Sequence, residues 1–123
     1  MSQKTILYVE DNEFNKIVRQ LLAKTSYSLV EAMDGEAGVA AALAAPPDLI
    51  LMDIQLPKMS GLEATRQLRG DARTAGVPII VVTSFALSGD DQKAKAAGAT
   101  AYLAKPYSPR ELLAKIRAIV PEA

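Results

Sequence analysis

Polar residues that could handle a hard cation or a phosphoryl group follow four of the apolar segments in this sequence. They are Glu10, Asp11, Asp53, Thr83, Ser84 and Lys105. Clustered carboxylates repel one another unless a cation joins them, and Mg²⁺ takes one or two carboxylates and completes its shell with water and phosphate oxygens. An aspartate can also attack phosphorus and form an aspartyl phosphate. These residue types therefore favour Mg²⁺-assisted phosphoryl transfer to a carboxylate.

Taken singly, most of these residues could have a simpler structural role. Asp11 or Asn12 could cap the helix that follows, and most lysines are only solvated. Asp53 is harder to account for in this way, because Pro57 separates it from the next helix signal at Ser60. An acid directly after Leu-Ile-Leu-Met would lie at the rim of the core, where an unpaired charge is costly. Asp53 is therefore the leading candidate for the reactive carboxylate.

The composition narrows the chemistry and the partners. The chain has 123 residues, 50% of them hydrophobic, which suits one ordinary domain with a sizeable core. Its 14 basic and 14 acidic residues leave no excess charge for binding nucleic acid or a membrane surface. The lack of His and Cys excludes Ser-His-Asp and Cys-His catalysis, and it restricts any metal to a hard cation held by oxygens. Because there is neither a signal-peptide pattern nor a cysteine, we expect a cytoplasmic protein.

Five apolar runs predict the strands that would position these residues. The runs are Ile6–Val9, Ser28–Val30, Leu49–Met52, Pro78–Val82 and Ala101–Leu103. Segments with helical spacing alternate with them; Asp34, Ser60 and Ser108 are expected to cap three of these helices, and Gly98 is expected to end another. Five β-α units imply an α/β fold with a mainly parallel sheet and helices on both faces. The candidate residues should then meet at one edge, because ligands bind at the carboxyl ends of parallel strands.

The motifs resemble those of a known family, the receiver domains of bacterial response regulators, from Lys4 to Val120. The matching stretches are Leu7–Asn12, Pro47–Gly61, Val81–Ser84, Ala97-Gly98 and Tyr102–Pro106. In detail they are most similar to stand-alone regulators of the DivK type or to receivers of hybrid kinases. The resemblance implies a doubly wound (βα)5, flavodoxin-like fold with strand order 2-1-3-4-5. It also implies a single receiver domain over residues 1–123, without an output domain.

The resemblance further implies a metal site around the phosphoacceptor, which would be Asp53. The expected ligands of Mg²⁺ are Glu10, Asp11, Asp53 and the backbone carbonyl of Gln55. Glu10 stands where the family most often has Asp, and its longer side chain should still reach the cation.

Residues at the ends of the fourth and fifth predicted strands would sense the phosphoryl group. Thr83, Ser84 and Lys105 are expected to contact it, with Ser84 standing where Ala is usual in the family. Thr83 would move toward the phosphoryl group and Tyr102 would turn inward, altering the face built from the fourth helix, the fifth strand and the fifth helix. Lys105-Pro106 is expected to be a cis peptide, as in the family.

The resemblance implies protein partners on both sides of the switch. The donor would be a phosphohistidine on a histidine kinase or a histidine phosphotransfer protein, and the output would be a contact with a downstream protein. The chain would be a signalling phosphoacceptor and not an enzyme.

Three alternatives remain. A phosphatase with an aspartate nucleophile would need a second acid where Gln55 stands. A nucleotide or flavin binder would need a Gly-rich loop after the first strand, where residues 10–15 contain no Gly. A receiver-like module used only for interaction would not need the acids, Thr83 and Lys105, which are all present.

Overall fold

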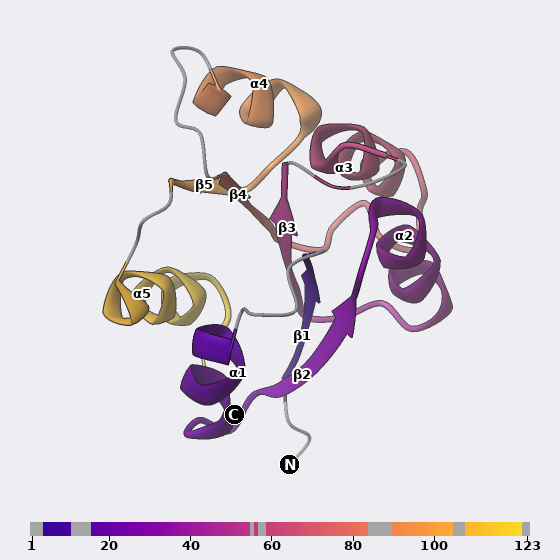
Figure 1. Ribbon diagram of the computed structural model, residues 1–123. Helices are drawn as coiled ribbons and strands as arrows, with labels where there is room; N and C mark the ends of the chain where they lie inside the picture. The colour runs from indigo at the N-terminus through magenta and orange to yellow at the C-terminus, as the bar shows by residue number, and fades with distance from the viewer. Residues whose placement is uncertain are drawn as a thin grey trace.

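Five β-α units follow one another along the chain (Figure 1). The computed structural model describes residues 4–10, 16–54, 56, 59–83, 90–104 and 108–121, with the backbone alone at 16, 17, 83, 90 and 91. The strands are β1 (Thr5–Val9), β2 (Ser28–Ala32), β3 (Leu49–Asp53), β4 (Ile79–Thr83) and β5 (Ala101–Ala104). The helices are α1 (Lys16–Ala23), α2 (Gly35–Ala44), α3 (Gly61–Arg69), α4 (Asp90–Ala97) and α5 (Pro109–Ile119). No helix in the described ranges combines the length and the apolar character that crossing a bilayer requires.

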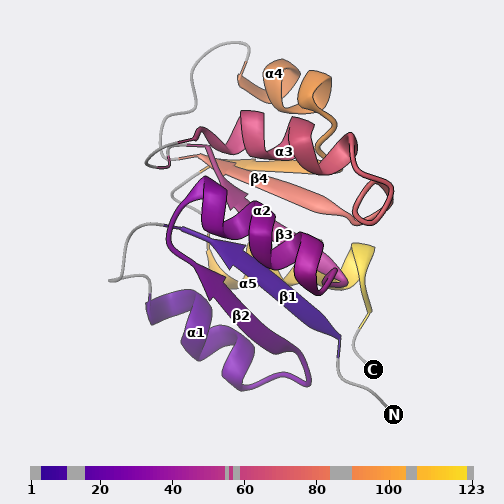
Figure 2. The ribbon, with the colours of Figure 1, turned by 90° about the vertical axis from the view of Figure 1, so that its right-hand side faces the viewer.

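The strands form one parallel sheet in the order β2-β1-β3-β4-β5. Helices α1 and α5 cover one face, and α2, α3 and α4 cover the other (Figure 1). Figure 2 shows α2 in front of the sheet and α5 behind it. The predicted doubly wound fold is confirmed, and the strand order reverses at the neighbouring strands β1 and β3.

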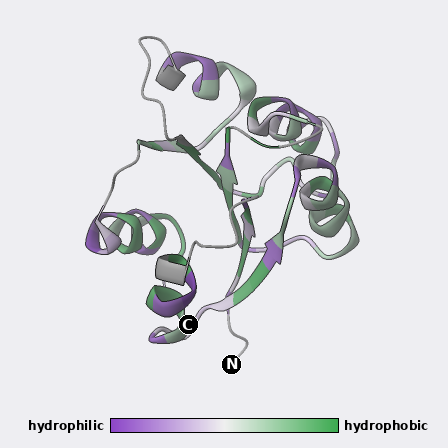
Figure 3. Cartoon of the chain, in the orientation of Figure 1, coloured by the Kyte–Doolittle hydropathy of each residue, from purple (hydrophilic) through white to green (hydrophobic). Residues whose placement is uncertain are grey.

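Two hydrophobic clusters bury the sheet on both faces. Every residue of β3 is buried. Leu49 and Leu51 pack toward α1 and α5, whereas Ile50 and Met52 pack toward α2, α3 and α4. This alternation follows from the two-residue period of a strand, and the unbroken apolar run follows from burial on both faces. Figure 3 shows the same division, with mainly hydrophobic central strands and hydrophilic residues on the helices.

Helix boundaries are marked by the residues that the sequence indicates. The side chain of Asp34 accepts a hydrogen bond of 2.7 Å from the backbone at the start of α2, and that of Ser60 accepts one of 3.2 Å at α3. Ser108 and Glu111 form a capping box at the start of α5. Gly98, with φ of 106°, follows α4 in the left-handed conformation that favours glycine.

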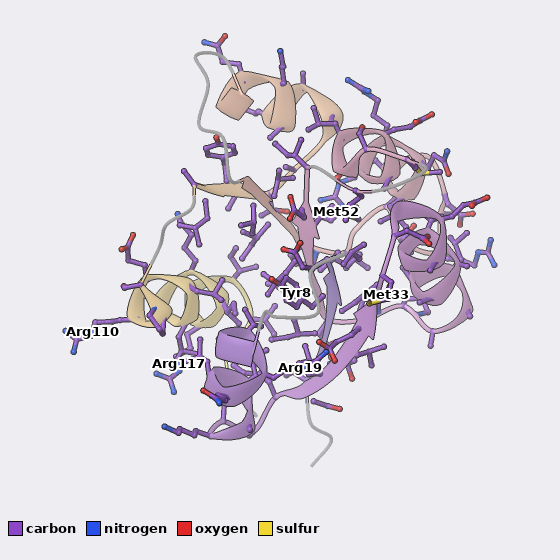
Figure 4. The ribbon with its side chains drawn as sticks, viewed as in Figure 1. Tyr8, Arg19, Met33, Met52, Arg110 and Arg117 are labelled. Carbon is purple, nitrogen blue, oxygen red and sulfur yellow. The ribbon has the colours of Figure 1, made fainter. Side chains whose placement is uncertain are left out.

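Strand β2 is longer than its apolar run predicts. It continues beyond Val30 through Glu31 and Ala32, which pair with β1. Glu31 also accepts hydrogen bonds of 2.7 and 3.0 Å from Nε of Arg19 in α1 (Figure 4). A polar residue can continue an edge strand where one face meets water, which an apolar run does not indicate.

Candidate functional site

Glu10 and Asp53 lie beside one another at the carboxyl edge of the sheet. Val9 of β1 is opposite Met52 of β3, so the next residue of each parallel strand brings Glu10 next to Asp53. Figure 4 shows Tyr8 and Met52 on these two strands. Glu10 is 7% exposed and Asp53 is 4% exposed. The pair therefore lies where the strand order reverses, which is where open α/β sheets bind ligands.

Both carboxylates belong to the side of the sheet that α1 and α5 cover. Glu10 comes two residues after Tyr8, and Asp53 two residues after Leu51, and both of these earlier residues lie in the cluster under α1 and α5. Residues two apart along a strand share a face. The hydroxyl of Tyr8 donates a hydrogen bond of 3.3 Å to Oε2 of Glu10, and the amide of Glu10 donates one of 3.0 Å to the carbonyl of Ala32.

The backbone of Asp53 is held from two directions. The amide of Ile54, the next residue, donates to the carbonyl of Val82 in β4 at 3.0 Å, which extends the β3–β4 ladder past the acid. On the other side, a Cβ added to Gly61 would lie 1.9 Å from the carbonyl oxygen of Asp53. Only glycine fits there. This role of Gly61 was not predicted from the sequence; the signal that could have indicated it is a poor helix former in the first turn of a helix.

Two buried carboxylates of like charge favour a cation between them. Each disfavours the ionised form of the other, and burial adds to that cost. Carboxylate oxygens are the donors that Mg²⁺ prefers, so the donor set fits this ion. No cluster of three or more side chains able to bind a metal occurs among the described residues. The third predicted acid, Asp11, and the predicted carbonyl ligand of Gln55 lie outside them.

The predicted switch residues lie on neighbouring strands. Thr83 is the last residue of β4 and is opposite Ala104 of β5, and Tyr102 is opposite Val81. Tyr102 is partly buried and packs against the cluster on the side of α4. The structure does not describe the other predicted residues, which are Ser84, Lys105 and Pro106, nor the side chain of Thr83.

A hollow of about 280 Å³ opens beside Tyr102. Its other lining residues are Ala94, Lys95, Ala99, Thr100 and Ala101, from α4, from β5 and from the turn between them. Tyr102 therefore borders both the packed side of β5 and an open space on the predicted output face.

The response regulator receiver domain family matches residues 6–117 of this chain. The polar-differentiation response regulators DivK of Brucella ovis and of Brucella abortus are each 39% identical to it over 121 residues, which is 98% of both chains. These relatives therefore span almost the same length as this chain.

Solved structures of receivers have the same fold. The chemotaxis protein CheY4 of Vibrio cholerae superposes with a TM-score of 0.89 at 29% identity, over 97% of this chain and 100% of that one. The receiver domain of the sensor histidine kinase PA1611 from Pseudomonas aeruginosa superposes with a TM-score of 0.88 at 36% identity, over 96% of this chain and 98% of that one. That structure has a magnesium ion coordinated in its active site cleft. With the reversal of strand order at Glu10 and Asp53, these matches establish that the chain belongs to the response regulator receiver domains of two-component signalling.

Proposed function

We propose that Asp53 accepts a phosphoryl group from a phosphohistidine on a histidine kinase or a histidine phosphotransfer protein, in a reaction that requires Mg²⁺. One observation carries the proposal: Asp53 is an almost fully buried acid beside Glu10, at the edge where the strand order reverses. A buried acid pair costs free energy unless a ligand or a partner group compensates it, and such pairs are frequent at functional sites. We also propose that the chain acts in the cytoplasm.

Mg²⁺ would be held by the carboxylates of Glu10, Asp11 and Asp53 and by the backbone carbonyl of Gln55. When bound, the ion supplies positive charge against the phosphoryl oxygens. The acid pair described above and the magnesium ion in the related Pseudomonas receiver both support this assignment.

In the transfer step, a carboxylate oxygen of Asp53 attacks phosphorus in line with the bond to the donor imidazole. The new P–O bond forms as the P–N bond breaks, and the imidazole leaves with the electron pair and takes up a proton. The hydroxyls of Thr83 and Ser84 and the ammonium of Lys105 would contact the phosphoryl oxygens. The fixed backbone of Asp53 suits this step, because in-line attack depends on orientation.

The phosphoryl group would change the surface made by α4, β5 and α5. It adds negative charge and acceptor oxygens at the end of β3, next to the strand that carries Thr83. Thr83 would move toward it, and Tyr102, on the neighbouring strand, would turn inward from the hollow that it borders. A downstream protein would then read the altered surface.

Intact mass after incubation with acetyl phosphate and Mg²⁺ tests the proposal. We expect one phosphoryl adduct on the wild type and on Asp71→Asn, which changes a surface acid, and no adduct on Asp53→Asn. An unmodified wild type would favour a module used only for interaction. Continuous release of phosphate from varied phosphomonoesters would favour a phosphatase instead.

A further inference from the structure

Tyr8 is the unusual residue of β1. The strand is otherwise aliphatic apart from Thr5, and all its residues from Ile6 to Val9 are buried. Tyr8 itself is 2% exposed. A buried phenol needs a hydrogen-bond partner for its hydroxyl. An aliphatic side chain at the same place would need no such partner. The hydroxyl of Tyr8 has such a partner in Oε2 of Glu10, at 3.3 Å.

This hydrogen bond links the core to the acid pair. Glu10 has one more rotatable bond than an Asp would have, so its carboxylate can occupy more positions. The hydroxyl of Tyr8 restricts those positions; its O–O distance of 3.3 Å leaves room for the hydrogen bond to shorten toward the length usual for a carboxylate acceptor. A carboxylate has about four lone-pair sites, so a donor on Oε2 is compatible with a cation on the same group. Glu10 and Asp53 are on the same side of the sheet as Tyr8.

We propose that Tyr8 is a positioning residue for the cation site, whose hydroxyl orients the carboxylate of Glu10 and thereby increases the affinity for Mg²⁺. The proposal rests on the proposed function, because it takes Glu10 to be a ligand of the ion. Groups that hydrogen-bond to metal-binding carboxylates have this effect in other metal sites. The hydroxyl of Tyr8 would thus hold the longer side chain of Glu10 in the position that binds the ion.

Tyr27 provides a matched control. It is 5% exposed, belongs to the same hydrophobic cluster as Tyr8, and also donates its hydroxyl to a buried acceptor, the carbonyl of Val120. That acceptor lies after the end of α5, in a different part of the chain from the acid pair. Tyr8→Phe and Tyr27→Phe therefore remove the same atom from the same cluster, but the first removes the hydrogen bond to Glu10 and the second the hydrogen bond to Val120.

Calorimetric titration of unphosphorylated protein with Mg²⁺ compares the two variants. We expect Tyr8→Phe to weaken Mg²⁺ binding about 10-fold, at the lower end of the range for such hydrogen bonds. Tyr27→Phe should lower the melting temperature and leave the affinity unchanged. Equal affinity of Tyr8→Phe and the wild type would overturn the proposal, and so would equal weakening by both variants.

The same titration in a Glu10→Asp background tests whether Tyr8 acts through Glu10. The carboxylate of Asp is one methylene shorter and should lie beyond the reach of the hydroxyl, so Tyr8→Phe should then change the affinity less than two-fold. An undiminished effect in that background would contradict the proposal. The difference between the effects of Tyr8→Phe in the wild-type and the Glu10→Asp backgrounds measures the coupling between positions 8 and 10.

A spectroscopic measurement on the wild type needs no substitution. With tyrosines labelled with ¹³C at Cζ, saturation with Mg²⁺ should shift the signal of Tyr8 and leave that of Tyr27 in place. A fixed Tyr8 signal would overturn the inference while leaving the proposed function intact if the phosphoryl adduct still forms. A wild type that neither binds Mg²⁺ nor forms the adduct would overturn both.

Discussion

The two edges of the sheet hold their charged side chains in opposite ways: the carboxyl edge has a buried pair of acids, and the amino edge has one partly buried arginine. At the carboxyl edge, two acids of the same sign, Glu10 and Asp53, lie beside one another. At the amino edge, the guanidinium of Arg69 at the end of α3 is surrounded by neutral acceptors. They are the carbonyls of Thr74, Ala75, Val77 and Gly98 and the hydroxyl of Thr100.

The difference separates a cluster that holds the fold together from the acid pair that we propose binds a ligand. Burial lowers the pKa of Arg69, and the acceptors around the guanidinium offset the cost of removing it from water. The acceptors come from the segment before β4 and from the turn before β5, so Arg69, at the end of α3, joins three parts of the chain. At the acid pair, by contrast, a bound cation would lower the electrostatic free energy. Changes at Arg69 should therefore alter stability, and changes at the acids should alter ligand binding.

Gly61→Ala should have the largest effect, at the carboxyl edge. Its Cβ would lie 1.9 Å from the carbonyl oxygen of Asp53, and a backbone atom cannot rotate away. We expect a loss of at least about 3 kcal/mol in the free energy of unfolding, at the upper end of overpacking changes. Urea denaturation measures it. Gly76→Ala is the control, because nothing lies within 4 Å of its added Cβ; equal effects of the two changes would show that the contact is not tight.

Arg69→Met should have the next largest effect. It keeps a long side chain but removes the donors to Gly98 O at 2.7 Å, to Ala75 O at 3.1 Å and to their neighbours. Leaving these acceptors without a donor should cost about 2–3 kcal/mol. Arg66→Met, on the exposed side of the same helix, should stay within about 0.5 kcal/mol of the wild type. If both variants unfold at the same urea concentration, the amino edge is not held by Arg69.

Glu10→Gln should have a smaller effect of the opposite sign. Removing one of two like charges should stabilise the protein by up to about 1 kcal/mol when Mg²⁺ is absent. The rise in melting temperature on adding Mg²⁺ should shrink at the same time, because ligand binding stabilises only as far as the folded state binds it. Calorimetric scans with and without Mg²⁺ measure both. A destabilised variant without Mg²⁺ would mean that the two acids do not repel one another.

The smallest effect should come from an ion pair at the surface. Hydrogen bonds from the side chain and the amide of Arg73 lower the pKa of Asp71 to about 2. An unfolded chain has an aspartate pKa of about 3.9, so this pair stabilises the fold above about pH 4 and loses that effect as the pH falls toward 2. The melting temperatures of wild type and Asp71→Asn should therefore differ slightly at pH 5 and converge toward pH 2. A difference that grows on acidification would contradict the assignment.

The sequence predicts the carboxyl edge better than the amino edge, for a physical reason. Apolar runs mark buried strands, and a charge at the end of such a run, as at Asp53, is costly unless a ligand or a partner compensates it. Parallel order then brings Glu10 to the same place. At the amino edge, Arg69 reaches acceptors as far away as Thr100 along the chain. Nothing in the local sequence distinguishes it from Arg66, because its partners are mostly backbone carbonyls, which every residue carries.

Two contacts at the site depend on three-dimensional packing, so the sequence pattern does not predict them. Gly61 lies against the carbonyl of Asp53, and a hydrogen bond of 2.8 Å from Gly61 N to Ile54 O holds the start of α3 at the end of β3. Tyr8 and Glu10, two residues apart, share a side by the period of the strand alone, so their proximity could be predicted, but their hydrogen bond depends on rotamers. β2 extends through Glu31 because pairing with β1 decides its end.

The most direct test of the central claim locates the phosphoryl group itself. Borodeuteride reduces an aspartyl phosphate to deuterated homoserine, which marks the acid that carried the group. After incubation with acetyl phosphate and Mg²⁺, tandem mass spectrometry of the peptides should find homoserine at position 53 and at no other acid, and none when Mg²⁺ is left out. A reduced side chain at another acid, or an Asp53 that stays intact in protein carrying the adduct, would contradict Asp53 as the phosphoacceptor.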